Sequence, residues 1–354
     1  MQRIIAAAFL TASLSLATPA PTRAAPAQGA LEALDEGLKL HEAGKPKEAI
    51  REYDRAIKTD PKFAAAYFNR GNAYYDLGQY SRALRDYGAA LRFNPKDAEA
   101  LYNRANAYQR LKRYDLALED FDAAIKLNPE DARSYVLRGD IYFDQKRYDL
   151  AVKDFSEAIR LDPKDAENFY NRGNGLFALG QIEDAIQDYD QAISLDAALT
   201  EAYYNRGIAY ADTGRLNRAI QDFSQALDLN PKSAHAFYYR ARAKAKLGQH
   251  EAAIDDYSEA MRLDPKDSEA TLNRGLAFLK IEKYDYAARD FSEVIRMQPG
   301  NADAYVYRGI SRIYQHKDKD AEADLRKAFQ LKPGLKKGLQ PIIDDARVKA
   351  QAKD

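Results

Sequence analysis

The sequence predicts an all-α fold of stacked helix pairs, and three features of the chain support this prediction. Prolines recur at a spacing of 34 residues along most of the chain. Between successive prolines, apolar residues follow two short helical patterns separated by a turn signal. Hydrophobic residues make up 46% of the chain, which suffices for a packed core, and there is no cysteine for disulfides.

The prolines mark the ends of a repeating unit. Asp or Asn precedes most of them, and either residue before proline disfavours continuation of a helix. Ala197 stands where the series lacks a proline, so we expect the chain from Leu195 to Tyr203 to stay helical or nearly so. The prolines of the series are Pro61, Pro95, Pro129, Pro163, Pro231, Pro265, Pro299 and Pro333.

Each unit contains two helical patterns, as residues 64–97 illustrate. Tyr67 and Gly71 lie on one face of a first helix, Gly78 marks a break, and Tyr87 lies in the apolar stripe of a second helix. Neither helix buries its stripe alone, so neighbouring units must stack.

Small residues recur in the middle of the first helix of each unit. A glycine there costs about 1 kcal/mol relative to alanine, so a close approach of two helices must compensate. We therefore expect Gly71 to lie where the first helix crosses the second, opposite Ala83.

The unit resembles the tetratricopeptide repeat. That family's pattern is a large apolar residue, a small residue four positions later, an aromatic, an alanine, an aromatic, an alanine and a proline. The resemblance implies an α-solenoid, a right-handed superhelix of tandem helix-turn-helix units closed by a C-terminal capping helix. In residues 64–97 the matching positions are Tyr67, Gly71, Tyr74, Ala83, Tyr87, Ala90 and Pro95.

The resemblance divides the chain into nine repeats followed by a capping helix and tail at 336–354. Residues 25–29 form a linker, and residues 1–24 have the form of a secretory signal peptide. The predicted repeats are 30–63, 64–97, 98–131, 132–165, 166–199, 200–233, 234–267, 268–301 and 302–335.

The signal-peptide prediction rests on the N-terminal residues. Arg3 precedes an apolar stretch from Ile4 to Leu16, and small residues follow up to Ala24 and Ala25, where cleavage is expected. The stretch is shorter than the roughly 20 residues that span a bilayer, so we expect a periplasmic or secreted protein without a membrane span. The alternative is an uncleaved amphipathic tail.

Arginine and aspartate recur in step, the first in the first helix and the second in the second helix of each unit. Arg70, Arg104 and Asp86 are examples, while the first repeat carries Glu36 and Glu52 at the two positions. Two carboxylates would repel within one repeat, so we favour a ladder between repeats, from Asp86 to Arg104 and onward. Simple divergence of the first repeat is the competing explanation. We interpret the pairs as structural rather than as an arginine spine for an acidic ligand.

The resemblance places a groove on the inner wall formed by the first helices. Asparagines and aromatics fill the groove-facing positions, and an asparagine can bond a peptide backbone in either direction. This pattern resembles the asparagine ladders of some long members of the family; the alternative is that the asparagines only solvate the wall. The predicted peptide-binding residues are Phe68, Asn69, Asn72, Tyr102, Asn103, Asn106, Tyr170, Asn171, Asn174, Tyr204, Asn205 and Asn273.

The rim of this predicted groove looks acidic, which favours basic or neutral peptides. The carboxylate clamp of chaperone-binding members is not matched, because residues such as Tyr102 and Glu99 occupy its positions. The segment 234–267 departs from the rest, which suggests a local change of specificity; its distinctive residues are His235, Tyr238, Tyr239, Arg242 and Lys244.

Other functions find little support in the sequence. The 54 basic and 54 acidic residues balance, which argues against a nucleic-acid binder. Four scattered histidines show no metal-ligand spacing, and we expect no catalytic residues, no metal and no cofactor. We therefore predict a non-catalytic scaffold that binds extended segments of partner proteins, with self-association not excluded. The alternative is a self-assembling or structural subunit of a cell-envelope secretion or polysaccharide-export complex.

Overall fold

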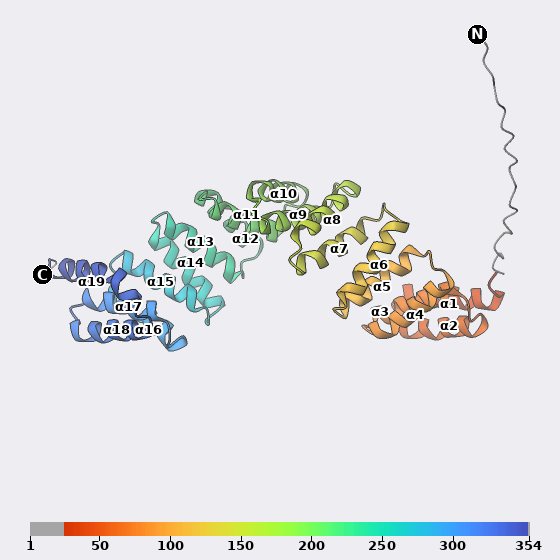
Figure 1. Ribbon diagram of the computed structural model, residues 1–354, viewed down its shortest axis with the longest axis horizontal. Helices are drawn as coiled ribbons and strands as arrows, with labels where there is room; N and C mark the ends of the chain where they lie inside the picture. Colours follow the sequence, from red (N-terminus) through yellow and green to blue (C-terminus); the bar gives the residue numbers. More distant parts are fainter. Residues whose placement is uncertain (1–24, 353–354) are drawn as a thin grey trace, which may run out of the picture. The chain divides into compact units, whose positions relative to one another are not determined.

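The computed structural model describes residues 25–352, and its regular elements over that range are all α-helices (Figure 1). The predicted signal peptide, residues 1–24, lies outside the described residues. The all-α prediction is confirmed. The helices are α1 (Gln28–Glu42), α2 (Pro46–Thr59), α3 (Ala64–Asp76), α4 (Tyr80–Phe93), α5 (Ala98–Arg110), α6 (Tyr114–Leu127), α7 (Ala132–Asp144), α8 (Tyr148–Leu161), α9 (Ala166–Ala178), α10 (Ile182–Leu195), α11 (Thr200–Asp212), α12 (Leu216–Leu229), α13 (Ala234–Lys246), α14 (His250–Leu263), α15 (Ser268–Lys280), α16 (Tyr284–Met297), α17 (Ala302–Ile313), α18 (Asp318–Leu331) and α19 (Leu335–Gln351).

The described part of the chain divides into two compact units, the first ending at Asn128 and the second beginning at Pro129. In each unit an odd-numbered helix packs against the even-numbered helix that follows it, and that helix packs against the next odd-numbered one. Helices of about 14 residues are marginal in water on their own, so this stacking supplies their stability.

The second helix of each pair shows why the pattern folds this way. In α4, the buried residues Ala83, Tyr87 and Ala90 recur every three or four positions and form one stripe. In the turn between α3 and α4, Gly78 adopts a φ of 70°, a left-handed conformation that glycine reaches at little cost. The aspartate before α5, Asp97, accepts a hydrogen bond from the Ala100 backbone N–H and caps that helix.

The close approach predicted at Gly71 is confirmed, but its partner differs from the expectation. A Cβ on Gly71 would lie 2.7 Å from Cε1 of Tyr87, closer than real Cβ contacts come. The glycine therefore makes room for the aromatic ring of the facing helix, rather than for the backbone near Ala83. Gly173 meets Tyr189 in the same way in the second unit.

The prediction that Ala197 lets the helix continue is wrong. Helix α10 ends at Leu195 and α11 begins at Thr200, so the junction is a turn like those that contain proline. The Asp196 carboxylate accepts a hydrogen bond from the Ala198 N–H at 2.8 Å. Beside Pro163, the Asp162 carboxylate accepts the equivalent hydrogen bond from the Lys164 N–H. The aspartate therefore stabilises the turn with or without proline.

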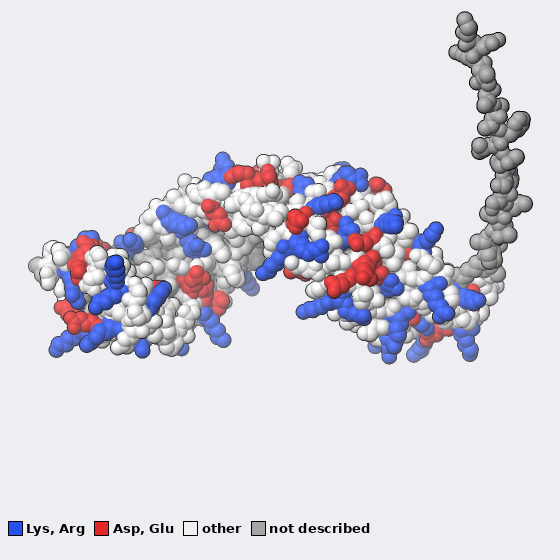
Figure 2. Space-filling view, viewed as in Figure 1, with Lys and Arg blue, Asp and Glu red and all other residues white. Residues whose placement is uncertain are grey.

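The last helix, α19, covers the end of the second unit. Its residues Ile343, Ala346 and Ala350 are buried in one cluster with Ile313 and Leu325 of α17 and α18. This burial gives α19 the role of the predicted capping helix. On the face shown in Figure 2, lysines and arginines are interspersed with aspartates and glutamates, as the balanced composition leads one to expect.

Candidate peptide-binding surface

Arginine–aspartate forks hold the helix pairs from α3–α4 to α17–α18 together. In α9 and α10, Arg172 Nε donates to one carboxylate oxygen of Asp188 and Nη2 donates to the other, both at 2.7 Å. Asp188 is only 5% exposed, so this ion pair lies in a low-dielectric setting. The hydrogen bond that Arg172 donates to Asp188 raises the pKa of Arg172 above its ordinary value. Equivalent forks join Arg70 to Asp86, Arg104 to Asp120, Arg138 to Asp154, Arg206 to Asp222, Arg240 to Asp256, Arg274 to Asp290 and Arg308 to Asp324.

The favoured ladder from Asp86 to Arg104 is therefore wrong, because each fork lies within one helix pair. The inference failed at the first repeat, where the Glu52 carboxylate lies 2.9 Å from Arg55 on its own helix. Glu52 thus has a cation beside it and needs none from the next repeat.

A link between neighbouring helix pairs does exist, but it uses a different partner. The third guanidinium nitrogen of Arg240, Nη1, donates to the Ser224 hydroxyl of the preceding pair at 3.0 Å. In the same way Arg206 donates to Asp190 at 2.6 Å. One arginine thus joins its own pair and the pair before it.

The predicted aromatic residues lie half-buried on the odd-numbered helices, beside these forks. Tyr102 packs edge-on against Phe121 with ring centroids 6.0 Å apart. In the second unit, the ring centroids of Tyr204 and Phe223 lie 6.0 Å apart. The predicted residues Phe68 and Tyr170 pack similarly against Tyr87 and Tyr189. Part of each ring remains accessible to a ligand.

The predicted asparagines form contacts between neighbouring helix pairs. Asn103 Nδ2 donates to Asn72 Oδ1 at 3.1 Å, and Tyr87 OH donates to the same oxygen at 2.8 Å. The second unit repeats this arrangement, with Asn174 Oδ1 accepting from Asn205 and from Tyr189.

The remaining predicted asparagines are half-buried on the same helix positions. Asn69 Nδ2 donates to the Ala65 carbonyl at 2.8 Å, and Asn273 Nδ2 donates to Tyr238 OH at 3.2 Å. No hydrogen bond is described for the side chains of Asn106 and Asn171. We call the surface that these predicted residues form on each unit the candidate surface.

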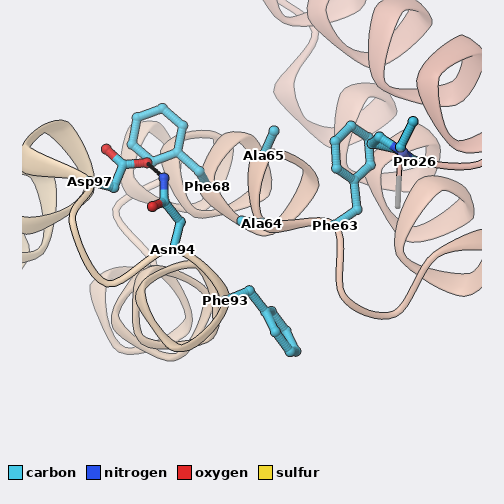
Figure 3. A pocket seen from close by; sticks show the side chains of 9 residues that line it. Pro26, Phe63, Ala64, Ala65, Phe68, Phe93, Asn94 and Asp97 are labelled. Carbon is cyan, nitrogen blue, oxygen red and sulfur yellow. Dashed lines mark hydrogen bonds between the residues drawn. The ribbon is translucent and has the colours of Figure 1, made fainter. Parts of the chain in front are cut away.

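Cavities adjoin the candidate surface in both units. In the first unit, a cavity of about 510 Å³ is lined by Phe68, Phe63, Asn94 and Asp97 (Figure 3). In the second unit, Tyr204 lines a cavity of about 350 Å³. Phe68 and Tyr204 hold the same position of their repeats, so the fold places a hollow beside this aromatic in both units.

Acidic side chains that the sequence analysis did not single out also lie on the second unit's helices. Asp140 takes the place that Asn174 holds one repeat later. Burial raises the pKa of the Asp140 carboxyl to about 6, and the charges of Asp144 and Glu167 add to the rise. The spacing of 34 residues from Asn174 would have identified Asp140 as a member of this series.

In segment 234–267, Lys244 forms an ion pair, whereas Arg242 packs against aromatic rings. Lys244 Nζ lies 2.7 Å from an Asp256 oxygen and so belongs to the forks. Arg242 instead lies over the rings of Tyr238 and Tyr239, at 5.7 Å and 5.4 Å from their centroids. Of the two cations in this prediction, only Arg242 lies with Tyr238 and Tyr239, which belong to the same prediction.

Among residues 25–352, every helix is too short or too polar to span a lipid bilayer. The same residues contain no group of three or more histidines and carboxylates placed to hold a metal ion.

The fold and the repeating forks define a solenoid of helix pairs. Models of the tetratricopeptide repeat match most of the chain between residues 37 and 335, and the chain belongs to this family. The number of nine repeats remains a prediction. The matched ranges are 102–166 and 272–335 for one tetratricopeptide repeat model, 37–78, 71–112, 173–214 and 241–282 for a TPR repeat model, and 200–233 for another tetratricopeptide repeat model.

Solved structures share this fold. The C-terminal part of a TPR repeat-containing protein from Cytophaga hutchinsonii is 17% identical, with a TM-score of 0.59 over 68% of this chain and 98% of that one. A tetratricopeptide repeat protein from Parabacteroides merdae is 21% identical, with a TM-score of 0.52 over 71% of this chain and 100% of that one. YrrB, described as a TPR protein with an unusual peptide-binding site, is 29% identical with a TM-score of 0.48, over 51% of this chain and 92% of its own. No curated protein matches the chain.

Proposed function

We propose that the protein is a non-catalytic scaffold that binds extended peptide segments of partner proteins along the candidate surface. One observation carries this proposal: the asparagine pairs Asn72–Asn103 and Asn174–Asn205 bridge neighbouring repeats on the same helix positions in both units. The repetition gives a series of amide groups in register with the helix pairs. Membership of a family that generally mediates protein interactions supports the same function.

The hydrogen bonds within each asparagine pair leave capacity for a ligand. Asn205 Nδ2 donates to Tyr170 and Asn174, whereas no bond is described to its side-chain oxygen. Such an oxygen can accept a hydrogen bond from a backbone N–H of an extended peptide, and the Asn174 Nδ2 group can donate to a peptide carbonyl. Main-chain bonds of this kind bind peptides with little dependence on their sequence.

The adjoining cavities supply apolar contact area. Phe68 and Tyr204 each present part of a ring to a hollow, and an aromatic ring offers large contact area with little loss of conformational entropy. A peptide bound through its backbone would place side chains in these hollows.

We further propose that the protein is exported, because residues 1–24 have the composition of a signal peptide. Expression of the full chain in a bacterium, followed by N-terminal sequencing of the periplasmic fraction, tests this. A mature N-terminus at Ala25 or Pro26 supports export, and an intact Met1 in the cytoplasm contradicts it.

The peptide-binding proposal is tested by measuring the affinity of a library of neutral extended peptides, by fluorescence anisotropy. Changing Asn69, Asn103, Asn171 and Asn205 together to Ala should weaken the binding peptides by about tenfold or more, since each lost hydrogen bond contributes about 0.5–1.5 kcal/mol.

Two controls make the result decisive. Asn171→Ala alone removes an amide for which no hydrogen bond is described, so any loss of affinity does not come from broken repeat packing. The double variant N128A/N217A changes exposed asparagines outside the candidate surface and its cavities, and it should bind as the wild type does. Equal peptide affinities for the wild type and the fourfold variant, with matching thermal melts, would contradict the proposal.

A further inference from the structure

A cavity outside the candidate surface lies in the first unit, beside the turn that joins α3 to α4. Its volume is about 470 Å³. One wall is this turn with the start of α4, and the other is Leu111, in the turn that joins α5 to α6. The lining residues are Gly78, Gln79, Tyr80, Ser81, Arg82 and Leu111.

The two turns are joined through Tyr75, in the last turn of α3. Arg110 Nε donates to the Tyr75 hydroxyl at 3.2 Å. The ring of Tyr80 packs edge-on against the ring of Tyr75, with the two centroids 5.1 Å apart. Because these contacts fix one turn against the other, the cavity between them is part of the packed structure.

Arg82 brings a positive charge to this cavity. Its Nη1 donates to the side-chain oxygen of Gln79 at 2.8 Å, and its guanidinium lies 5.5 Å from the ring centroid of Tyr74. Both contacts orient the guanidinium without neutralising it. The first turn of α4, where Arg82 lies, contains no acidic residue. Arg82 therefore keeps N–H donors for an anionic ligand.

Three further cations surround Leu111 at the turn between α5 and α6, and all three are exposed. Neither these cations nor Arg82 form an ion pair with any of residues 25–352. The three residues are Arg110, Lys112 and Arg113.

Nearby carboxylates offset only part of this charge. Asp76, at the end of α3, lies 2.7 Å from His41 Nε2. Asp115, in the first turn of α6, is the acid closest in sequence to the three cations. Four cations beside two carboxylates leave this part of the first unit positive.

The register of the repeat shows that this charge is local. Three positions are compared, those of Arg110, Lys112 and Arg113. In each of the other predicted repeats, at least one of the three equivalent residues is neutral or acidic. The equivalents are Asp76, Gly78 and Gln79 in the preceding helix pair and Asp144, Lys146 and Arg147 in the following one.

Leu111 adds an exposed apolar side chain in the middle of these cations. It is 37% exposed, and Lys112 beside it adopts a φ of 57°, so the chain reverses sharply here. Apolar, tyrosine and basic side chains occur together where proteins meet a membrane, because the apolar groups enter the lipid while the cations stay at the headgroups. An acidic peptide would match the cations, but its charge would not cover Leu111.

We propose that the surface formed by Arg82, Arg110, Leu111, Lys112 and Arg113 binds membranes that contain anionic phospholipids. A lipid phosphate enters the cavity beside Arg82, Leu111 inserts between neighbouring lipids, and the three exposed cations bind the surrounding headgroups. This function goes beyond peptide binding and uses residues outside the candidate surface. The protein can therefore hold a partner segment while it is bound to a membrane.

The experiment measures co-sedimentation of the full chain with lipid vesicles at about 0.1 M salt. One set of vesicles contains phosphatidylglycerol and phosphatidylcholine in equal amounts, and the other contains phosphatidylcholine alone. The triple variant R110Q/K112Q/R113Q should bind the anionic vesicles roughly a hundredfold more weakly than the wild type, because each cation near an anionic surface adds to the attraction. Binding to the neutral vesicles should be unchanged.

The triple variant K62Q/K96Q/K126Q is the matched control for net charge. It removes three exposed lysines of the same unit that lie outside the proposed surface, and it should bind the anionic vesicles nearly as the wild type does. Residues 1–24 are the same in every variant, so the comparison does not depend on them. Equal losses in the two triple variants would show a general charge effect and overturn the proposal.

Leu111→Ser tests the apolar contact. It should weaken binding to the anionic vesicles roughly fivefold and leave the thermal melt unchanged. An unchanged affinity would show that no side chain enters the lipid, which contradicts the proposal. Two other results would also overturn it: displacement from the vesicles by millimolar glycerol phosphate, which would show a site for soluble phosphate esters, and equally tight binding of a soluble glutamate polymer, which would show a surface for acidic proteins.

Discussion

Two regions of the second unit carry opposite charges on the same repeat frame. Helices α7 and α9, here called the acidic region, present Asp140, Asp144 and Glu167. Helices α13 and α15 and the α14 between them, here called the basic region, present Arg242 and Lys280. The arginine–aspartate forks behind both regions have the same geometry. Since the fork arginine Arg240 and Arg242 point to different sides of one helix, the charge of this surface can change from repeat to repeat while the packing stays constant.

The largest expected effect tests whether the arginine–aspartate forks stabilise the two regions equally. Arg172→Ala and Arg240→Ala should each lower the free energy of unfolding by about 3–5 kcal/mol, because each leaves a buried aspartate without its cation. Chemical denaturation followed by circular dichroism measures the loss.

The double variant R172A/D188A controls for the unpaired charge and should lose less than Arg172→Ala. Denaturation midpoints near the wild-type value for both arginine variants would show that the forks are solvated and do not form the common frame.

The acidic region should differ from the basic one in its response to pH. The folded state raises the pKa of Asp140 to about 6 from 3.8, so its charged form opposes folding and stability falls as the pH rises through this range. Asp140→Asn should therefore stabilise the protein by about 2–3 kcal/mol at pH 8, and the gain should vanish below about pH 4.

Asp212→Asn removes an exposed acidic side chain of α11 and is the matched control for that titration. A gain for Asp140→Asn that is the same at pH 4 and pH 8 would contradict the role of the charge.

A buried amide gives the next difference. Asn168 in α9 is 1% exposed, and neither amide atom has a hydrogen-bond partner among the described residues. The basic region has Ala236 at this position, also buried. Asn168→Ala should raise the free energy of unfolding by about 1–2 kcal/mol, and Ala236→Asn should lower it by a similar amount, both measured by denaturation. An unchanged midpoint for Asn168→Ala would show that the amide is satisfied.

The smallest expected effect concerns the turns within the helix pairs. Lys146 in the acidic region adopts φ of 60°, whereas Gly248 takes the same place in the basic region with φ of 79°. A left-handed conformation costs a side-chain-bearing residue about 1 kcal/mol or more, so Lys146→Gly should stabilise by about 1 kcal/mol. Gly248→Lys should destabilise by a similar amount. A thermal melt that is lower for Lys146→Gly than for the wild type would contradict this account.

Several structural features were predictable from local chemistry. The proline spacing and the recurrence of Gly71 and its equivalents gave the helix pairs, and the all-α fold follows from them. The candidate surface was predictable only as a set of positions. Hydrogen bonding between Asn72 and Asn103 joins residues 31 positions apart, and no local pattern reveals such a contact.

By itself, the sequence determined the periodicity, the helical stripes and the residue types available for binding, because these depend on local propensity and spacing. Tertiary structure decided which charges pair. Arg104 is 16 residues from Asp120 and 18 residues from Asp86, and only the packing of α5 against α6 directs its guanidinium to Asp120. The packing of α13 against α14 likewise pairs Arg240 with Asp256 and places Arg242 over Tyr238, since residues two positions apart point to different sides of one helix.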